Sequence, residues 1–243
     1  MNDSLAPLDP DASFRFGCSP GVACFNECCR DLNQFLTPYD VVRLKNRLGL
    51  PSDVFLARYT RRHTGPGTGL PVVTLAPADP ARLTCPFVAP SGCRVYPDRP
   101  SSCRTYPLVR ILRRPRESEG ILEEYRLLKE PHCRGFDAAR QQTVREWITN
   151  QGLADYLAEN DRLLEVIALK ARLSRKALPP SLEDQVYTAF YDMERFRGRL
   201  CDGSLDLAGV PAELIDPARQ DETALLRLGL EWVKQLLKKA LAC

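Results

Sequence analysis

The sequence predicts an α+β fold that is mostly helical, with a cysteine-rich first half and a helical second half. Eight of the ten cysteines lie within the first 133 residues. Short runs with β-branched or aromatic members occur in the same half, and long stretches of helical apolar periodicity fill the rest. We therefore expect a cysteine-cluster domain over residues 14–137, whose segments are held together by bound metal. A helical extension over residues 138–243 is expected to pack on it.

Two short helices are expected between the first and second groups of cysteines. Thr37 and Pro38 supply an N-cap and a first-turn proline, and Gly49 supplies the stop. A second helix is predicted to begin at Ser52. The segment 63–71 is rich in glycine and proline, which predicts a loop.

The other expected elements follow from periodicity. Three short runs predict strands, at residues 72–75, 108–112 and 125–128. Four stretches without internal proline predict amphipathic helices, at residues 138–150, 153–173, 182–197 and 222–241. The apolar face of the last stretch is expected to pack against the other helices, with a partner groove or a membrane surface as alternatives.

Length and composition favour a folded chain that needs no disulfides. A chain of 243 residues can bury a sizeable core, and a net charge of +3 is too small to indicate a nucleic-acid partner. The first ten residues show no signal sequence, and no apolar run is long enough to span a membrane. We expect a cytoplasmic protein, where ten cysteines favour metal or redox chemistry over structural disulfides.

The central cysteines lie in a repeated segment. Cys-Arg-Val-Tyr-Pro at 93–97 is followed by Cys-Arg-Thr-Tyr-Pro at 103–107. Proline fixes its own φ and pushes the preceding residue towards extended geometry. Each copy is therefore expected to present its thiol on a short stiff turn, with Tyr96 and Tyr106 covering the sulfurs and keeping water away.

Arginine directly follows four of the cysteines, which is more often than composition alone predicts. A site of several thiolates carries negative charge, and neighbouring guanidinium groups would offset that charge and lower the thiol pKa values. The alternative is that these arginines are solvated surface charges. They are Arg30, Arg94, Arg104 and Arg134.

The first cysteines follow the pattern C-x5-C-x3-C-C. If residues 24–31 are helical, Cys24 and Cys28 share one face, and Cys29 points about 100° away. Cys29 would then serve a second metal, or the helix would begin after it. Adjacent and Arg-flanked thiols pack poorly in a core, so we predict that the clustered thiols are metal ligands: Cys18, Cys24, Cys28, Cys29, Cys85, Cys93, Cys103 and Cys133.

The identity of the metal stays open at this point. The C-x2-C pairs of zinc ribbons and the runs of ferredoxins are both absent. Eight thiols suit one iron-sulfur cluster plus a zinc, two zinc sites, or one cluster with spare thiols. His132 is a further candidate ligand, whereas Cys201 and Cys243 are expected not to be ligands because they lie far along the chain.

At these residues the chain resembles the bacterial cysteine-cluster proteins of the YkgJ type, the CxxCxxCC family of zinc- or iron-chelating domains. The resemblance rests on the Cys24, Cys28, Cys29 group and on segments 85–87, 92–107 and 132–136. The first group is spaced more widely here than in the family pattern, which leaves Cys18 without a clear equivalent. The resemblance implies a metal-binding domain.

Three functions are compatible with the sequence. The first is a metal-binding module, iron-sulfur or zinc, whose helical half docks a protein partner. The second is an enzyme, either a redox enzyme or one similar to the flagellin lysine N-methylases, which the family resemblance brings in as distant relatives. No glycine-rich S-adenosylmethionine loop follows a strand. The third is a structural zinc scaffold for protein interactions.

Overall fold

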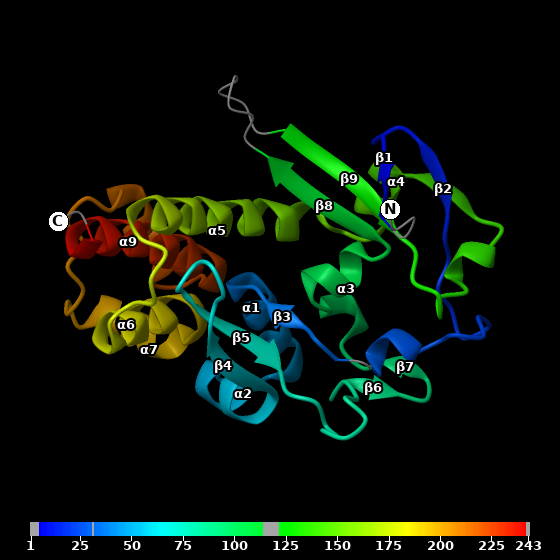
Figure 1. Ribbon diagram of the computed structural model, residues 1–243. Coiled ribbons are helices and arrows are strands. Elements are labelled where there is room, and N and C mark those ends of the chain that lie inside the picture. Colours follow the sequence, from blue (N-terminus) through cyan, green and yellow to red (C-terminus); the bar gives the residue numbers. More distant parts are fainter. Residues whose placement is uncertain (1–4, 31, 114–121, 242–243) are drawn as a thin grey trace.

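The computed structural model describes residues 5–30, 32–113 and 122–241 (Figure 1). Long helices gather at one end of the molecule, and over the rest the described residues form four small antiparallel sheets with shorter helices among them. The α+β prediction, with a helical C-terminal half, is confirmed. Asp31 and Cys243, both included in the sequence predictions, lie outside the described residues.

Helices α1 (Pro38–Leu48) and α2 (Ser52–Tyr59) form where local signals predict them. The Thr37 hydroxyl accepts the Asp40 N–H at 3.2 Å, and the Asp40 carboxylate accepts the Thr37 N–H at 2.9 Å. This reciprocal capping box fixes the start of α1. Gly49, at φ 65°, ends the helix because glycine adopts the left-handed region without steric cost.

The sheets pair strands from distant parts of the chain. The predicted strands are all present, as β5, β8 and β9, with neighbours that carry no strong sequence signal. The strand orders are β1 (Leu5–Leu8), β9 (Leu122–Leu128), β8 (Leu108–Arg113); β2 (Ser13–Arg15), β10 (Gln141–Thr143); β3 (Phe35–Leu36), β5 (Pro71–Leu75), β4 (Thr60–Thr64); and β6 (Val88–Ala89), β7 (Gly92–Cys93).

The loop predicted for residues 63–71 is shorter than expected. His63 pairs with Val72, and Thr64 pairs with Pro71, so both belong to the β4–β5 hairpin. The glycine and proline content marks only the connecting turn, because ladder pairing extends the strands up to it.

The described helices of the second half are α4 (Val144–Asn150), α5 (Ala154–Leu173), α6 (Pro180–Tyr191), α7 (Met193–Cys201), α8 (Ile215–Ala218) and α9 (Glu222–Leu241). The helix predicted over 138–150 begins only at Val144, because residues 141–143 pair with β2. The stretch 182–197 contains two helices rather than one. Asp192 ends α6 and accepts the Arg195 N–H at 3.2 Å, which caps α7.

A single hydrophobic core joins the two halves of the chain. The predicted apolar face of α9 is buried, with Val233 at 0% and Leu226 at 1% exposure, and it packs against α5, α6 and α1. The packing prediction for this face is therefore confirmed. Ala240, the last residue of the predicted face, is an exception because it is exposed. None of the helices in the described ranges is long and apolar enough to cross a membrane.

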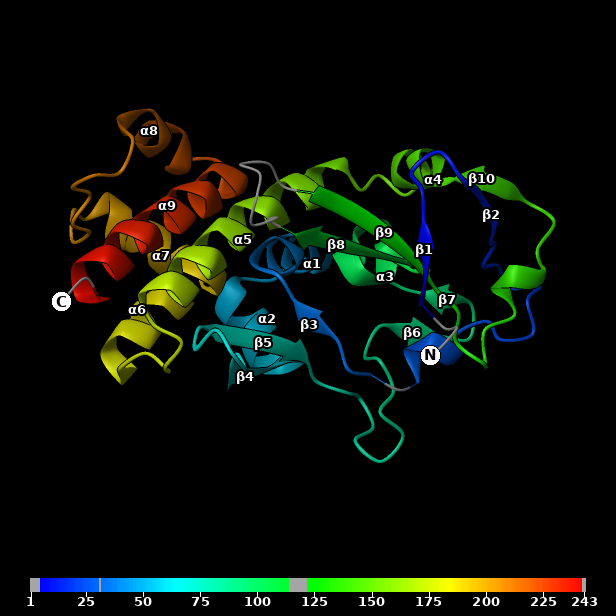
Figure 2. The same cartoon turned by 45° about the horizontal axis from the view of Figure 1, so that its top comes forward.

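The cysteine-bearing segments lie beside the strands, at the end of the molecule away from α9. In both views the turn at residues 27–29 lies next to β6 and β7 (Figures 1 and 2). Helix α5 connects this end with the helical end, since Asp161 on α5 pairs with Arg110 on β8. The fold therefore brings the cysteine segments together on a frame of small sheets and helix ends.

Candidate metal centre

Backbone hydrogen bonds join the first group of cysteines to the later ones. The Cys85 N–H donates to the Cys29 carbonyl at 2.8 Å. The Arg134 N–H, next to Cys133, donates to the Cys24 sulfur at 3.0 Å. Segments separated by more than fifty residues are therefore held at hydrogen-bond distance at the positions of the predicted ligands.

The first cysteine group is not an α-helix. Residues 19–26 form turns, and a single 3-10 turn covers Glu27–Cys29. The conditional argument that placed Cys24 and Cys28 on one helical face is wrong for this reason. Asn26 has a left-handed backbone at φ 70°, and its side-chain amide donates to the Ala89 carbonyl at 3.0 Å, which anchors the turn to β6.

The two adjacent thiols on this turn interact with each other. A hydrogen bond from the Cys29 thiol lowers the pKa of Cys28 to about 7, against the opposing effect of burial. The same hydrogen bond, with burial, raises the pKa of Cys29. Cys28 is therefore the thiolate of the pair near neutral pH, and thiolate is the form that binds metal.

The two Cys-Arg-x-Tyr-Pro copies have different local structures. Cys93 ends β7, and Tyr96 opens a short 3-10 turn. Cys103 instead lies within helix α3 (Ser101–Thr105). The expectation of two similar stiff turns, each with an extended tyrosine before its proline, is therefore wrong. Tyr96 lies in a 3-10 turn and Cys103 lies in a helix, so only Tyr106 takes the shape that the following proline favours.

Arginines of the repeat bind backbone carbonyls. Arg94 donates to the Pro86 carbonyl at 2.6 Å, which ties the Cys93 loop to the segment after Cys85. Arg104 donates to the carbonyl of Pro97, the last residue of the first copy. Both arginines thus join one cysteine segment to another.

Arg104 also anchors the repeat to the helical half. Its guanidinium donates to the Gln151 carbonyl and lies 4.6 Å from the ring centre of Tyr156 on α5. The residue is only 8% exposed, so these contacts are made inside the protein.

Arg99, which sequence reasoning missed, places positive charge beside the thiols. Burial raises the pKa of Cys93, and the charge of Arg99 opposes that rise. Arg99 lies 3.9 Å from the ring centre of Tyr96 and donates to its carbonyl at 2.7 Å. The sequence signal for Arg99 is its position before Pro100, between the two copies of the repeat.

The thiols influence each other's ionisation. Burial raises the pKa of Cys18 to about 11, helped by the charges of Cys28, Cys24 and Cys133. Cys103 is solvent-exposed but crowded by protein, and this crowding, with neighbouring thiolate charge, raises its pKa to about 12. The thiols whose charges act on one another or on Cys18 fall into two overlapping groups that share Cys28. They are Cys18, Cys24, Cys28 and Cys133, and Cys28, Cys29, Cys85, Cys93 and Cys103.

The segments that carry the predicted ligands meet, but their side chains are not arranged as a metal coordination shell. Among the described residues, no three His, Cys, Asp or Glu side chains are already spaced to hold an ion. The nine described cysteines are free thiols. Cys201 ends α7 in the helical half, and the Nε2 atom of His132 lies 3.8 Å from a Glu130 carboxylate oxygen.

The two predicted covering tyrosines differ. Tyr106 packs edge-on against Phe16, with ring centres 5.7 Å apart, and its buried hydroxyl lies against Cys133 without a hydrogen bond of standard geometry. Burial and this thiol raise the pKa of Tyr106. Tyr96 is 54% exposed and lies against Arg99. Of the two rings, Tyr106 is therefore the one that shields a thiol.

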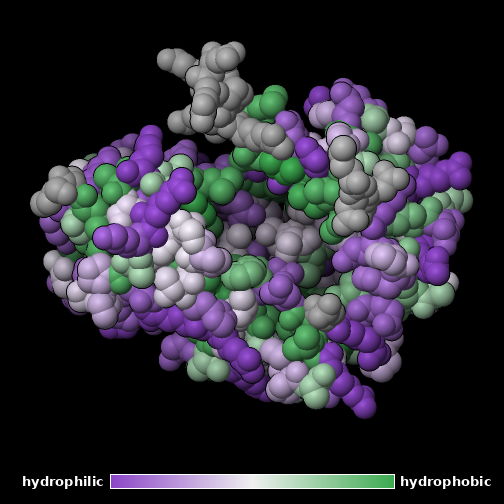
Figure 3. Space-filling model, in the orientation of Figure 1, coloured by the Kyte–Doolittle hydropathy of each residue, from purple (hydrophilic) through white to green (hydrophobic). Residues whose placement is uncertain are grey.

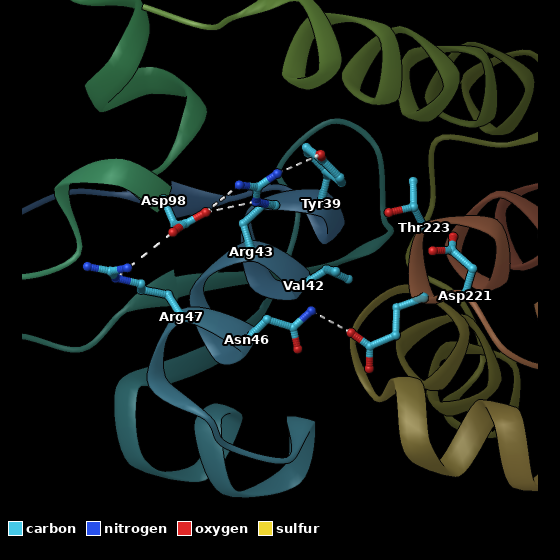
Figure 4. A pocket seen from close by; sticks show the side chains of 9 residues that line it. Tyr39, Val42, Arg43, Asn46, Arg47, Asp98, Asp221 and Thr223 are labelled. Carbon is cyan, nitrogen blue, oxygen red and sulfur yellow. Dashed lines mark hydrogen bonds and ion pairs between the residues drawn. The ribbon is translucent and has the colours of Figure 1, made fainter.

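A polar hollow of about 580 Å³ borders the repeat at Asp98 (Figure 4). Arg43 on α1 donates to Asp98 at 2.9 Å, and Arg47 lies 4.0 Å from the same carboxylate. Asn46, also on α1, donates to Glu222 at the start of α9 across the hollow at 2.7 Å. The Arg43–Asp98 ion pair therefore joins the repeat to α1 at this hollow.

A family model described as "CxxCxxCC: Putative zinc- or iron-chelating domain" matches residues 17–144, just over half of the chain. The matched segment contains all eight clustered cysteines. No curated protein and no solved structure gives a match, so the narrower YkgJ-type and methylase resemblances stay predictions. The chain belongs to the CxxCxxCC family of zinc- or iron-chelating domains.

Proposed function

We propose that the eight clustered thiols hold the zinc or iron that the family chelates. The observation that carries this proposal is the hydrogen-bonded meeting of separate segments at their cysteines, from Cys24 and Cys29 to Cys85 and Arg134. A packing role alone would not require these backbone donors to meet at sulfur-bearing positions.

The donor set fits such a metal. Thiolates are soft ligands that suit zinc and iron-sulfur clusters. Cys28, with a pKa of about 7, supplies one thiolate near neutral pH. Crowding and neighbouring negative charge raise the pKa values of Cys18 and Cys103, and a bound cation would relieve that repulsion. Arg99 contributes positive charge from the protein itself.

The two overlapping thiol groups support two neighbouring centres. Structural zinc takes four ligands, and eight thiols in groups that meet at Cys28 exceed that number. We infer one centre nearer Cys18, Cys24 and Cys133 and another nearer Cys85, Cys93 and Cys103. The metal, when bound, would supply structural cross-linking or electron transfer, and the protein residues would orient and shield it.

Single cysteine variants test the ligand assignment. Cys28→Ala should lose most of the bound metal, because Cys28 belongs to both thiol groups. Cys201→Ala is the matched control, since Cys201 is an exposed free thiol at the end of α7. Equal metal content in the two variants, measured by plasma mass spectrometry, would contradict the assignment.

The wider proposal places the protein in the cytoplasm as a metal-binding module. Free thiols in all nine described cysteines suit a reducing compartment. The division into a cluster domain over 14–137 and a helical extension over 138–243 is part of this proposal, as is a protein partner for the helical half. Limited proteolysis with and without metal would test the division, because metal should protect the first part selectively.

A further inference from the structure

A groove of about 420 Å³ lies on the outer face of the β3–β5–β4 sheet. Alternate residues of a strand face opposite sides, and Val73 and Leu36 are buried in the core at 0% and 3% exposure. The other face carries Phe35, Thr74 and Arg61, which lie side by side because Thr74 pairs with Phe35 on one strand and with Arg61 on the other.

Exposed apolar side chains line this groove. Phe35 is 50% exposed and Leu83 is 40% exposed, and hydrophobic atoms are visible over β3 and the end of β5 in the lower middle of Figure 3. The open face of an antiparallel sheet is usually polar, so an apolar patch there is informative.

The backbone at the groove's rim is strained. Leu83 has a φ of 47°, and its carbonyl accepts the Leu32 N–H at 3.0 Å. A leucine in the left-handed region is costly, and such positions gather at ligand sites.

The groove also offers one positive charge, that of Arg61, which lines it together with His63. The Nε2 atom of His63 lies 2.9 Å from the Thr74 hydroxyl oxygen, and none of the groove's described lining residues is acidic. No described carboxylate pairs with Arg61, whereas the next residue, Arg62, pairs with Glu183 at 3.2 Å and with Asp184 at 3.4 Å. Of these two adjacent arginines, Arg62 is therefore neutralised, and Arg61 has no partner among the carboxylates that the structure describes.

We propose that this groove binds an organic carboxylate of metabolite size with an aromatic or branched apolar body. Its volume falls within the range of small-molecule sites. The carboxylate would pair with Arg61, and the apolar body would lie on Phe35 and Leu83. This site goes beyond metal binding and depends on protein groups alone.

Gln34 places the groove next to the thiols. Its side-chain amide donates to the Phe35 carbonyl at 2.6 Å, and its amide oxygen lies 3.4 Å from the Cys103 sulfur. A ligand in the groove would therefore lie one side chain away from a proposed metal ligand.

Hydrocinnamate and its neutral amide are the probes, titrated into the full chain by saturation-transfer NMR. Hydrocinnamate should bind in the millimolar range or tighter, and the amide at least about tenfold more weakly, because it lacks the charge-assisted pair. Arg61→Gln should cause the same loss for hydrocinnamate. Arg58→Gln is the matched control, since Arg58 lies over the Tyr59 ring at 5.1 Å and does not line the groove.

Several results would overturn the proposal. One is the absence of hydrocinnamate binding up to about 10 mM. Another is equal hydrocinnamate binding by Arg61→Gln and the parent chain, and a third is binding of a short acidic peptide with one phenylalanine but not of hydrocinnamate. The titration is run on metal-loaded and metal-stripped protein whose fold is checked by circular dichroism. Hydrocinnamate binding by both metal-loaded and metal-stripped protein would support the groove, whereas failure of the protein to take up zinc or iron would count against the proposed metal centre alone.

Discussion

Asp40 should position the helix that carries Cys103. Its carboxylate is fully buried and accepts hydrogen bonds from the Ser101 N–H at 2.8 Å, the Ser101 hydroxyl at 3.1 Å and the Thr37 N–H at 2.9 Å. It therefore joins the start of α1 to the start of α3. The two backbone donors reach different carboxylate oxygens, so both oxygens are needed.

Asp40→Asn removes one of these two acceptors and keeps the size of the side chain. One buried N–H is left unpaired, which costs about 1–3 kcal/mol. The remaining bonds weaken as the charge is lost, and burying a neutral amide instead of a carboxylate offsets part of that cost. We expect a net loss of about 1–3 kcal/mol in the free energy of unfolding, and about tenfold weaker metal binding because Cys103 is less well held.

Urea denaturation of the reduced, metal-free protein measures the first effect, and competition with a chromophoric chelator measures the second. Asp216→Asn is the control, because the side chain of Asp216 is 96% exposed, and it should change stability by less than about 0.5 kcal/mol. If Asp40→Asn matches this control in both assays, Asp40 does not hold α3 in place.

Three further predictions concern ionisation and backbone geometry. In reduced, metal-free protein at pH 7, iodoacetamide should label Cys28 before Cys18 or Cys103, because the pKa values are about 7, 11 and 12; peptide mass spectrometry showing either of the others first would refute this. Burial acts to raise the pKa of Glu194, but hydrogen bonds from Ser52 and Lys45 outweigh it and hold that pKa at about 2, below the ordinary 4.5. The stability that Glu194 contributes should therefore be complete above about pH 4.5 and disappear as the pH falls towards 2. The difference in free energy of unfolding between the parent and Glu194→Gln should then narrow on acidification. A difference that stays constant with pH would be contrary to this reasoning. Gly69→Ala should destabilise the chain far more than Gly67→Ala. Both glycines have a positive φ, but only at Gly69 would an added Cβ meet a backbone oxygen, that of Lys176, at 2.2 Å. Equal unfolding midpoints of the two variants in urea would rule out the clash.

Elements with complete local signals could be predicted from the sequence. The bounds of α1 follow from Thr37 at one end and Gly49 at the other, and both act as the propensities predict. The stretch 182–197 could not be resolved in the same way, because its periodicity continues across the break. Asp192 divides it by capping α7, and periodicity alone does not reveal such a cap.

The candidate site was predictable in its residue types but not in its geometry. The excess of clustered cysteines indicates a metal-binding site, and the family match supports that interpretation. The different shapes of the two repeat copies depend on tertiary partners: Asp40 accepts the Ser101 N–H at the start of α3, and Ala89 pairs with Gly92 beside Cys93. The role of Arg99 likewise depends on which chain segments fold around it.

Metal and acid-labile sulfide content, measured together on protein purified without oxygen, tests the central claim most directly. Two neighbouring thiolate centres predict zinc or iron at two or more atoms per chain, with sulfide matching any iron beyond single ions and a visible absorption band if a cluster is present. Protein that retains less than one metal atom per chain, and takes up neither zinc nor iron after reduction, would contradict the account.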